Sequence, residues 1–153
     1  MRRTVTNKQK SAGKKKPKNL KSKLRDELDK VFSQYIRLKY SDENGYCRCI
    51  SCGKIHFWKD IQCGHYMSRR YMSTRWSEDN VRPQCVACNI FNQGNIQMFR
   101  RALIKEIGEQ RVDLIDARAR QETCKYSEFE YSVMIKEFKK KVIQLLKEKH
   151  LTV

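Results

Sequence analysis

Two cysteine pairs constrain this chain more than any other feature of its sequence. The first consists of Cys49 and Cys52 and the second of Cys85 and Cys88, with 32 residues between Cys52 and Cys85. Each C-x-x-C pair can place two thiolates on one metal ion, and two pairs complete the tetrahedral shell that zinc prefers. The pattern therefore predicts a structural Zn²⁺ site with no open position for a substrate. An iron–sulfur cluster and a redox-active dithiol are the alternatives.

The chain has seven cysteines, and the other three receive different interpretations. Cys47 could replace Cys49 as a zinc ligand, although the resulting C-x-x-x-x-C spacing fits a tight metal loop less well. We expect Cys63 to be a small buried residue and Cys124 to lie in a polar connection between helices. The start of the chain lacks the apolar stretch of a secretory signal. A reducing cytoplasm, where cysteines bind metal rather than form disulfides, is therefore the expected compartment.

The charge is strongly positive and unevenly distributed. The chain has 34 Lys and Arg against 17 Asp and Glu, for a formal net charge of +17. Ten of the basic residues and no acidic ones fall within residues 1–24, so we expect a disordered basic arm over residues 1–23. A polyanion such as DNA is the natural partner, because phosphates neutralised by Lys and Arg release counterions. No apolar run is long enough to cross a membrane, and we expect no membrane partner.

Apolar residues at helical spacing predict helices on both sides of the cysteine-rich segment. The first is expected over about residues 24–39. A second runs over 96–107 and ends before Gly108, and a short one follows around 111–120. Ser127-Glu128-Phe129-Glu130 has the pattern of a capping box and is expected to open the last helix.

The sequence divides into segments on this basis. Residues 24–45 form an N-terminal helix and turn, residues 46–95 a zinc-bound core, and residues 96–153 a C-terminal helical region. Within the core, short β-type runs at 55–58 and 60–63 predict small hairpins. The expected fold class is therefore α+β.

A histidine and two asparagines occupy ordered positions relative to the cysteine pairs. His65 follows Cys52 by 13 residues at the end of a predicted strand, Asn80 precedes a second strand, and Asn89 directly follows Cys88. This order resembles the HNH, or ββα-metal, nucleases. The chain resembles more closely the NinG (Rap) family of phage recombination endonucleases, over about residues 46–100. The motifs that carry this closer resemblance are Cys63-Gly64-His65-Tyr66-Met67-Ser68-Arg69, Thr74-Arg75-Trp76, Asp79-Asn80, Pro83-Gln84-Cys85, Cys88-Asn89 and Gly94-Asn95.

The resemblance implies a zinc-stabilised ββα-metal core flanked by α-helices. It also implies a phage or prophage protein that acts in the bacterial host cytoplasm as a DNA endonuclease. The implied substrates are branched recombination intermediates such as four-way junctions, and the implied catalytic cofactor is Mg²⁺ or Mn²⁺ beside the structural Zn²⁺. A homodimer would suit an enzyme that cuts two strands symmetrically.

Phosphodiester hydrolysis needs a base, a cation and positioning groups, and the three residues can be matched to these roles. His65 suits the general base, because an unperturbed imidazole is largely neutral at pH 7. Asn89 offers an oxygen ligand to the catalytic ion, and Asn80 would brace the loop that carries His65. HNH sequences often have an Asp or His just before the base as a second ligand, whereas this chain has Gly64. One of the nearby oxygen donors could complete the shell, or His65 itself could ligate the ion while another group or the phosphate activates water. These donors are Asp60, Gln62, Asn92 and Asn95.

Basic and aromatic residues crowd the segment between the two predicted strands. We expect the four arginines to contact DNA phosphates, with Arg69 and Arg75 the favoured pair, and the aromatic side chains to stack on unpaired bases. The arginines are Arg69, Arg70, Arg75 and Arg82, and the aromatics are Tyr66, Tyr71 and Trp76. A non-catalytic zinc-dependent nucleic-acid-binding module and an assembly factor acting through its helices are the rival interpretations.

Overall fold

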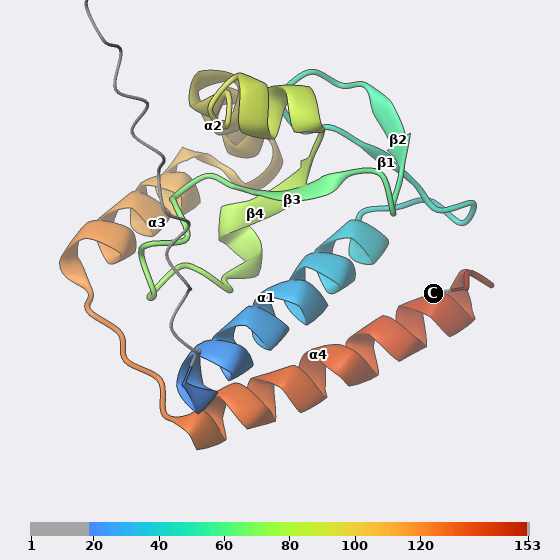
Figure 1. Ribbon diagram of the computed structural model, residues 1–153. Coiled ribbons are helices and arrows are strands. Elements are labelled where there is room, and N and C mark those ends of the chain that lie inside the picture. Colours follow the sequence, from blue (N-terminus) through green and yellow to red (C-terminus); the bar gives the residue numbers. More distant parts are fainter. Residues whose placement is uncertain (1–18, 153) are drawn as a thin grey trace, which may run out of the picture.

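The computed structural model describes residues 19–152, which form a mixed α+β fold (Figure 1). Residues 1–18, where most of the expected basic arm falls, and Val153 lie outside the described residues. The described part contains four α-helices and two antiparallel sheets of two strands each. In chain order the elements are α1 (Leu20–Lys39), β1 (Tyr46–Arg48), β2 (Ile55–Phe57), β3 (Gln62–His65), β4 (Val81–Gln84), α2 (Ile96–Ile107), α3 (Glu109–Gln121) and α4 (Glu128–Glu148).

Helix α1 begins four residues earlier than its apolar pattern predicted. Asn19 caps it, because the Oδ1 atom of Asn19 accepts a hydrogen bond from the backbone N–H of Ser22 at 2.8 Å. A side-chain acceptor at this position satisfies one of the free N–H groups of the first turn. Residues 20–23 are therefore helical, and the basic arm predicted to reach residue 23 ends before them.

Helices α1 and α4 lie side by side and run in the same direction (Figure 1). Their interface is aromatic: the ring of Phe138 lies 5.0 Å from that of Phe32 and 5.2 Å from that of Tyr35. The predicted capping box opens α4, with the side chains of Ser127 and Glu130 each bonded to the other's backbone. The interface between α1 and α4 is the largest contact between elements of the described chain. Strands β3 and β4 pack against α1 of this pair.

The hairpin of β3 and β4 carries the predicted histidine. It is antiparallel, with Gln62 opposite Gln84 and His65 opposite Val81. The strands lie across α1 (Figure 1), and buried residues of α1, α4 and the strands belong to one apolar cluster. The short run predicted at 55–58 corresponds to β2, which pairs with β1, whereas the run predicted at 60–63 starts two residues before β3.

Helices α2 and α3 pack together around a second, smaller cluster. Its buried members are Tyr66, Phe99, Leu103, Val112 and Ile115. Gly108 separates the two helices with a φ of 85°, a value that glycine adopts without steric cost. The bounds predicted for α2 are confirmed, and α3 extends one to two residues beyond its prediction at each end. No helix among residues 19–152 has the length and apolar character needed to cross a membrane.

Candidate metal centre and catalytic cleft

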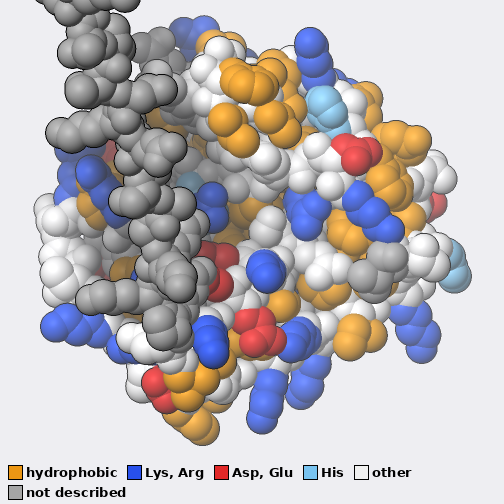
Figure 2. Space-filling model, in the orientation of Figure 1, with side chains coloured by type: hydrophobic (Ala, Val, Ile, Leu, Met, Phe, Trp, Pro, Cys, Tyr) orange, Lys and Arg blue, Asp and Glu red, His pale blue; other side chains and the backbone are white. Residues whose placement is uncertain are grey.

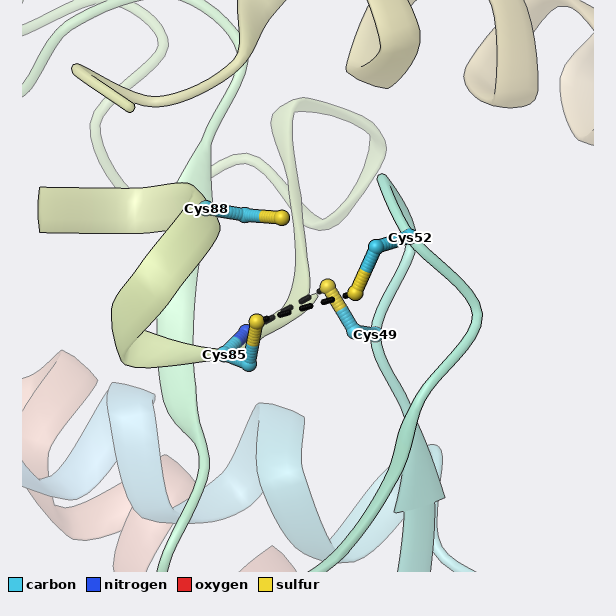
Figure 3. Close-up of side chains that lie close together, drawn as sticks. All are labelled: Cys49, Cys52, Cys85 and Cys88. Atoms are coloured by element: carbon cyan, nitrogen blue, oxygen red, sulfur yellow. Dashed lines mark hydrogen bonds between the residues drawn. The ribbon is translucent and has the colours of Figure 1, made fainter. Parts of the chain in front are cut away.

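The four paired cysteines meet at one point in the structure. Cys49 and Cys52 come from the loop between β1 and β2, Cys85 directly follows β4, and Cys88 lies in the π-helical turn Ala87–Phe91. Their sulfur atoms all lie within 4.8 Å of one another and point into a common space (Figure 3). The two pairs therefore converge as the sequence predicted.

The geometry of this cluster fits a tetrahedral zinc ion. Zn–S bonds of about 2.3 Å place neighbouring sulfurs about 3.8 Å apart in a tetrahedron, and the Sγ atoms of Cys52 and Cys85 are 3.7 Å apart. The backbone N–H of Cys85 donates to the Sγ of Cys49 at 3.4 Å. Burial opposes ionisation of Cys49, but backbone N–H donors outweigh it and lower the pKa of this thiol to about 7. Cys49 is thus inclined to be a thiolate, the form that binds metal. Burial raises the pKa of Cys88 to about 12 and also raises that of Cys52, so these thiols would ionise when a metal ion supplies positive charge.

The remaining cysteines lie outside the cluster. Cys47 is buried and its thiol donates to the backbone carbonyl of Arg37 at 3.1 Å, so Cys49 and not Cys47 is the ligand that the structure offers. Burial raises the pKa of Cys47 to about 11 and that of the buried Cys63 to about 12. Cys124 lies between α3 and α4, in the connection where it was expected.

His65 ends β3 and is held by a backbone contact. Its Nε2 lies 3.0 Å from the carbonyl oxygen of Arg75. Because a carbonyl only accepts hydrogen bonds, Nε2 carries the hydrogen, and Nδ1 is the unprotonated nitrogen of the neutral ring. Desolvation, aided by the positive charge of Arg69, lowers the pKa of His65 to about 4. The imidazole is therefore neutral at pH 7, the state that a base or a metal ligand requires.

His65 and Asn89 line the same cleft. Two adjoining cavities, of about 390 and 520 Å³, are both lined by Cys63, His65, Arg69 and Asn89. The Nδ2 of Asn89 donates to the Oε1 of Gln62 at 2.7 Å, which leaves the carboxamide oxygen of Asn89 without a partner among the described residues. The structure thus brings together the two side chains that the sequence analysis paired.

The π-helical turn explains how one segment can serve both the metal centre and the cleft. Its wide turn is closed by a hydrogen bond from the backbone N–H of Asn92 to the carbonyl of Ala87, at 2.9 Å. Such turns are rare and concentrate at functional sites. Cys88 belongs to the sulfur cluster, while the adjacent Asn89 lines the cleft. A zinc ion on Cys88 would therefore fix the position of Asn89.

Asn80 ties together the long connection between β3 and β4. It is fully buried. Its Oδ1 accepts from the N–H of Met67 at 2.7 Å, and its Nδ2 donates to the carbonyls of Met67 and Thr74 at 2.9 and 3.0 Å. These are the side-chain to backbone bonds expected of a residue that braces the loop after His65.

Gly64, where HNH sequences often have a metal ligand, has no room for any side chain. A Cβ atom at this position would lie 2.4 Å from the Oε1 of Gln84, which faces Gly64 across the hairpin. Gln84 is fully buried and cannot withdraw easily, because its Nε2 donates to Ser51 and to the carbonyl of Gly94. Packing in the hairpin therefore accounts for the glycine.

Two of the four arginines predicted to contact DNA have internal partners instead. Arg75 forms a two-pronged ion pair with Asp29, with an Nε to Oδ1 distance of 3.0 Å, and its side chain is 13% exposed. Arg82 is 4% exposed and pairs with Glu106 at 2.6 Å. We correct the prediction for these two residues, because both guanidinium groups are committed to the fold.

The other two arginines are exposed beside the cleft. Arg69 lines both cavities and makes no side-chain hydrogen bond or ion pair within the described part of the chain. Arg70 lines the second cavity and lies over the ring of Tyr71 at 4.6 Å. The charged residues that line the two cavities are Arg37, Lys59, Arg69, Arg70, Arg120 and Asp29. Since Asp29 is neutralised by Arg75, the cleft is cationic.

Sequence analysis missed several of these lining residues. Arg37, Lys59 and Arg120 come from α1, the β2–β3 loop and α3, and no local pattern distinguishes them from other basic residues. Only the folded arrangement brings them to His65.

The fold and the sulfur cluster define a class: a small α+β protein organised around a four-cysteine centre suited to zinc. A sequence profile described as "Bacteriophage Lambda NinG protein" matches residues 1–148, and the chain belongs to the NinG family. The family resemblance seen in the cysteine and His-Asn motifs is thereby confirmed.

Curated relatives carry the same family name. The chain is 30% identical to Protein ninG of Escherichia phage lambda and 31% identical to Protein ninG of Salmonella phage P22. Each alignment covers 78% of this chain and 64% of the relative. Protein ninG of Escherichia phage 933W is 29% identical over 78% of this chain and 65% of the relative. The chain thus spans slightly less than two thirds of the length of these relatives. A comparison with solved structures gave no significant match.

Proposed function

We propose that this protein is a metal-dependent DNA endonuclease of HNH type that acts on branched recombination intermediates such as four-way junctions. The observation that carries the proposal is the cleft in which His65 and Asn89 face a lining of Arg and Lys side chains. A cationic cleft concentrates a polyanionic substrate, and a neutral imidazole inside it can accept a proton from water.

In this proposal His65 is the general base. Its Nδ1 has the lone pair that takes the proton of the attacking water, while the Arg75 carbonyl holds the ring through Nε2. The depressed pKa keeps the base unprotonated near pH 7. Arg69 and Arg70 bind the phosphate oxygens on either side of the reacting group, because guanidinium groups match phosphate geometry.

The donor set of the cleft decides which residues would hold a catalytic ion. Mg²⁺ or Mn²⁺, when bound, supplies positive charge to the phosphate and the leaving oxygen. The oxygen of Asn89 is the candidate protein ligand while the Nδ1 of His65 acts as the base. His65 is the alternative ligand only where another group or the phosphate activates the water, because its one lone pair cannot serve both roles. Mg²⁺ keeps several waters and often takes substrate phosphates as ligands, so an ion held by one neutral protein oxygen would take the rest of its shell from water and the DNA phosphate.

One observation favours the rival function, a zinc-dependent nucleic-acid-binding module without catalysis. Within residues 19–152, the four cysteines are the only group of three or more His, Cys, Asp or Glu side chains close enough to share a metal ion. The one carboxylate that lines the cleft belongs to Asp29, and Arg75 occupies it. A cleft without a free carboxylate can still bind DNA, so the two functions require a direct test.

The test uses His65→Ala on four-way junctions with Mg²⁺ or Mn²⁺. Loss of a general base should lower the cleavage rate by roughly 10²–10⁴-fold while junction affinity stays near that of the wild type. His150→Asn is the matched control, because His150 is exposed and has a φ of 53° that Asn tolerates. This control should cleave at the wild-type rate.

Two outcomes would overturn the proposal in different ways. If His65→Ala cleaves normally, His65 is not the base. If the wild-type protein binds junctions but cleaves none with either ion, the binding module is the better description.

A further inference from the structure

We propose that Phe91 stacks on an unpaired base of the DNA bound in the cleft and so contributes selectivity for branched over linear DNA. This inference rests on the proposed function in so far as DNA occupies the cleft. It assigns a role to a residue that no part of the foregoing mechanism uses.

Phe91 is the most exposed large apolar side chain of the described chain, at 78%. It belongs to a group of exposed apolar residues between positions 86 and 98. The other members are Val86, Ile90, Ile96 and Met98, with exposures of 37%, 54%, 41% and 42%. Figure 2 shows hydrophobic side chains gathered at the top of the view, over α2 and the segment before it. Apolar surface concentrated in one short segment marks an interaction site more often than isolated exposed residues do.

The segment that carries Phe91 forms the rim of the cleft. Asn89 lines both cavities, Ile90 lines the first, and Gln93 and Ile96 line the second. Phe91 itself lines neither cavity, but it lies on a turn whose neighbours on both sides line them. A base attached to a phosphate bound in the cleft, or to the next one along the strand, would be within reach of this turn.

The turn is held rigidly on both sides of Phe91. Cys88 belongs to the metal cluster, and its carbonyl accepts a hydrogen bond from the N–H of Gly94 at 3.0 Å. The N–H of Asn92 closes the π-helical turn onto Ala87. An aromatic ring presented by such a fixed turn loses little conformational freedom on binding.

The positive charge of the adjoining cleft indicates which kind of partner binds this surface. Lys59, Arg69, Arg70 and Arg120 line the adjoining cleft, so a partner must combine an apolar face with negative charge. A second copy of this chain, with its own net charge of +17, complements these cations less well than a nucleic acid does. An unpaired nucleotide has both an apolar base face and a phosphate, whereas bases in linear duplex are already stacked.

Two of the three aromatic residues that the sequence predicted for this role are engaged elsewhere. Tyr66 is 6% exposed, and its hydroxyl donates to Asp116 at 2.9 Å. Trp76 donates through Nε1 to Asp29 and packs edge-on against the ring of Tyr131. The third, Tyr71, lines the second cavity and is only partly exposed, with the guanidinium of Arg70 over its ring. Phe91, which the sequence analysis did not single out, is the more exposed aromatic ring beside the cleft.

The experiment compares junction and linear duplex binding by the full chain with Ca²⁺ in place of Mg²⁺, so that binding is measured without relying on cleavage. A 2-aminopurine base at the branch point of the junction reports stacking through its fluorescence. Phe91→Ala should weaken junction binding by roughly 5- to 100-fold, the range found when base-stacking aromatics are removed. It should also abolish the fluorescence change, and leave duplex affinity within about twofold.

Two further variants make the test specific. Phe91→Trp keeps a stacking surface and should bind junctions like the wild type. Phe129→Ala removes another highly exposed phenylalanine, 76% exposed in the first turn of α4, and should change neither readout.

The outcomes separate this inference from the proposed nuclease. Equal losses of junction and duplex binding, or no loss at all, would show that Phe91 does not stack on bases. A change in oligomeric state by light scattering in Phe91→Ala would assign the surface to protein contact instead and would also overturn the inference. A wild-type protein that shows the fluorescence change but does not cleave would remove the nuclease and leave the stacking role intact.

Discussion

At the scale of single residues, close packing around Gly64 determines which residue can precede His65 in β3. Gly64 permits the close approach of Gln84 across the β3–β4 hairpin, and the backbone of Gly64 does not have a positive φ. Space, and not backbone conformation, therefore requires glycine at this position. The Oε1 of Gln84 has no conventional hydrogen-bond partner, and it faces the position that a side chain at Gly64 would occupy. A Cα–H contact from Gly64 is the favourable interaction open to this oxygen.

This geometry predicts the effect of Gly64→Ala. The new methyl group would overlap Gln84, and overpacking of a closed site costs about 1–3 kcal/mol of folding free energy. Chemical denaturation with zinc present measures the loss. A Gln84→Ala background removes the contact with Oε1 at 2.4 Å and keeps only that with the Cβ of residue 84 at 2.7 Å. The same substitution should therefore cost less there, with a coupling of at least about 0.5 kcal/mol. Strictly additive effects would show that the two side chains do not compete for space.

At the scale of elements, the fold depends on helices whose local signals are strong. The start and end of α2, the capping box of α4 and the apolar stripe of α1 were all readable from the sequence, because helical spacing and caps are local. The sequence did not predict that α1 packs against α4, because no local pattern specifies which apolar helix face packs on which other one. The same limit applies to β1 and β2, whose three-residue strands carry little pattern.

The pairing of α1 with α4 can be tested at Phe138, which touches two aromatic rings of α1. Phe138→Ala should lower the free energy of unfolding by about 3–5 kcal/mol, because it leaves a cavity between the helices. Phe129→Ala, on the same helix but exposed, should change it by no more than about 0.5 kcal/mol. Similar losses for both variants in urea denaturation would mean that α4 does not pack on α1 through this face.

At the scale of the whole molecule, the sulfur cluster connects segments that are far apart in the chain. The β1–β2 loop, the end of β4 and the π-helical turn meet there, and Cys49, Cys85 and Cys88 also belong to the main apolar cluster. A zinc ion bound by the four cysteines would fasten these segments together. The cysteine pairs were predictable from sequence because their spacing alone encodes the site. The internal partners of Arg75 and Arg82 were not, since Asp29 and Glu106 lie 46 and 24 residues away along the chain.

The zinc assignment predicts one ion per chain by native mass spectrometry. Cys85→Ser should lose the ion and the protection from hydrogen exchange in residues 46–95, because structural zinc contributes on the order of 10 kcal/mol to folding in small zinc modules. Cys124→Ser, which alters a cysteine outside the cluster, should keep both. A strong chelator that leaves the circular dichroism spectrum unchanged would contradict the prediction.

The ammonium group of Lys149 at the end of α4 donates to the carbonyl of Leu38 at 2.7 Å, across a separation of 111 residues. During synthesis on the ribosome, α1 emerges long before α4. The apolar face of α1 therefore stays uncovered until α4 has been made. Contacts between segments far apart in the sequence slow folding, and until they form the apolar surface remains exposed and prone to aggregation. A nascent chain arrested before residue 128 should therefore bind chaperones through α1, and release should follow only once α4 has left the exit tunnel.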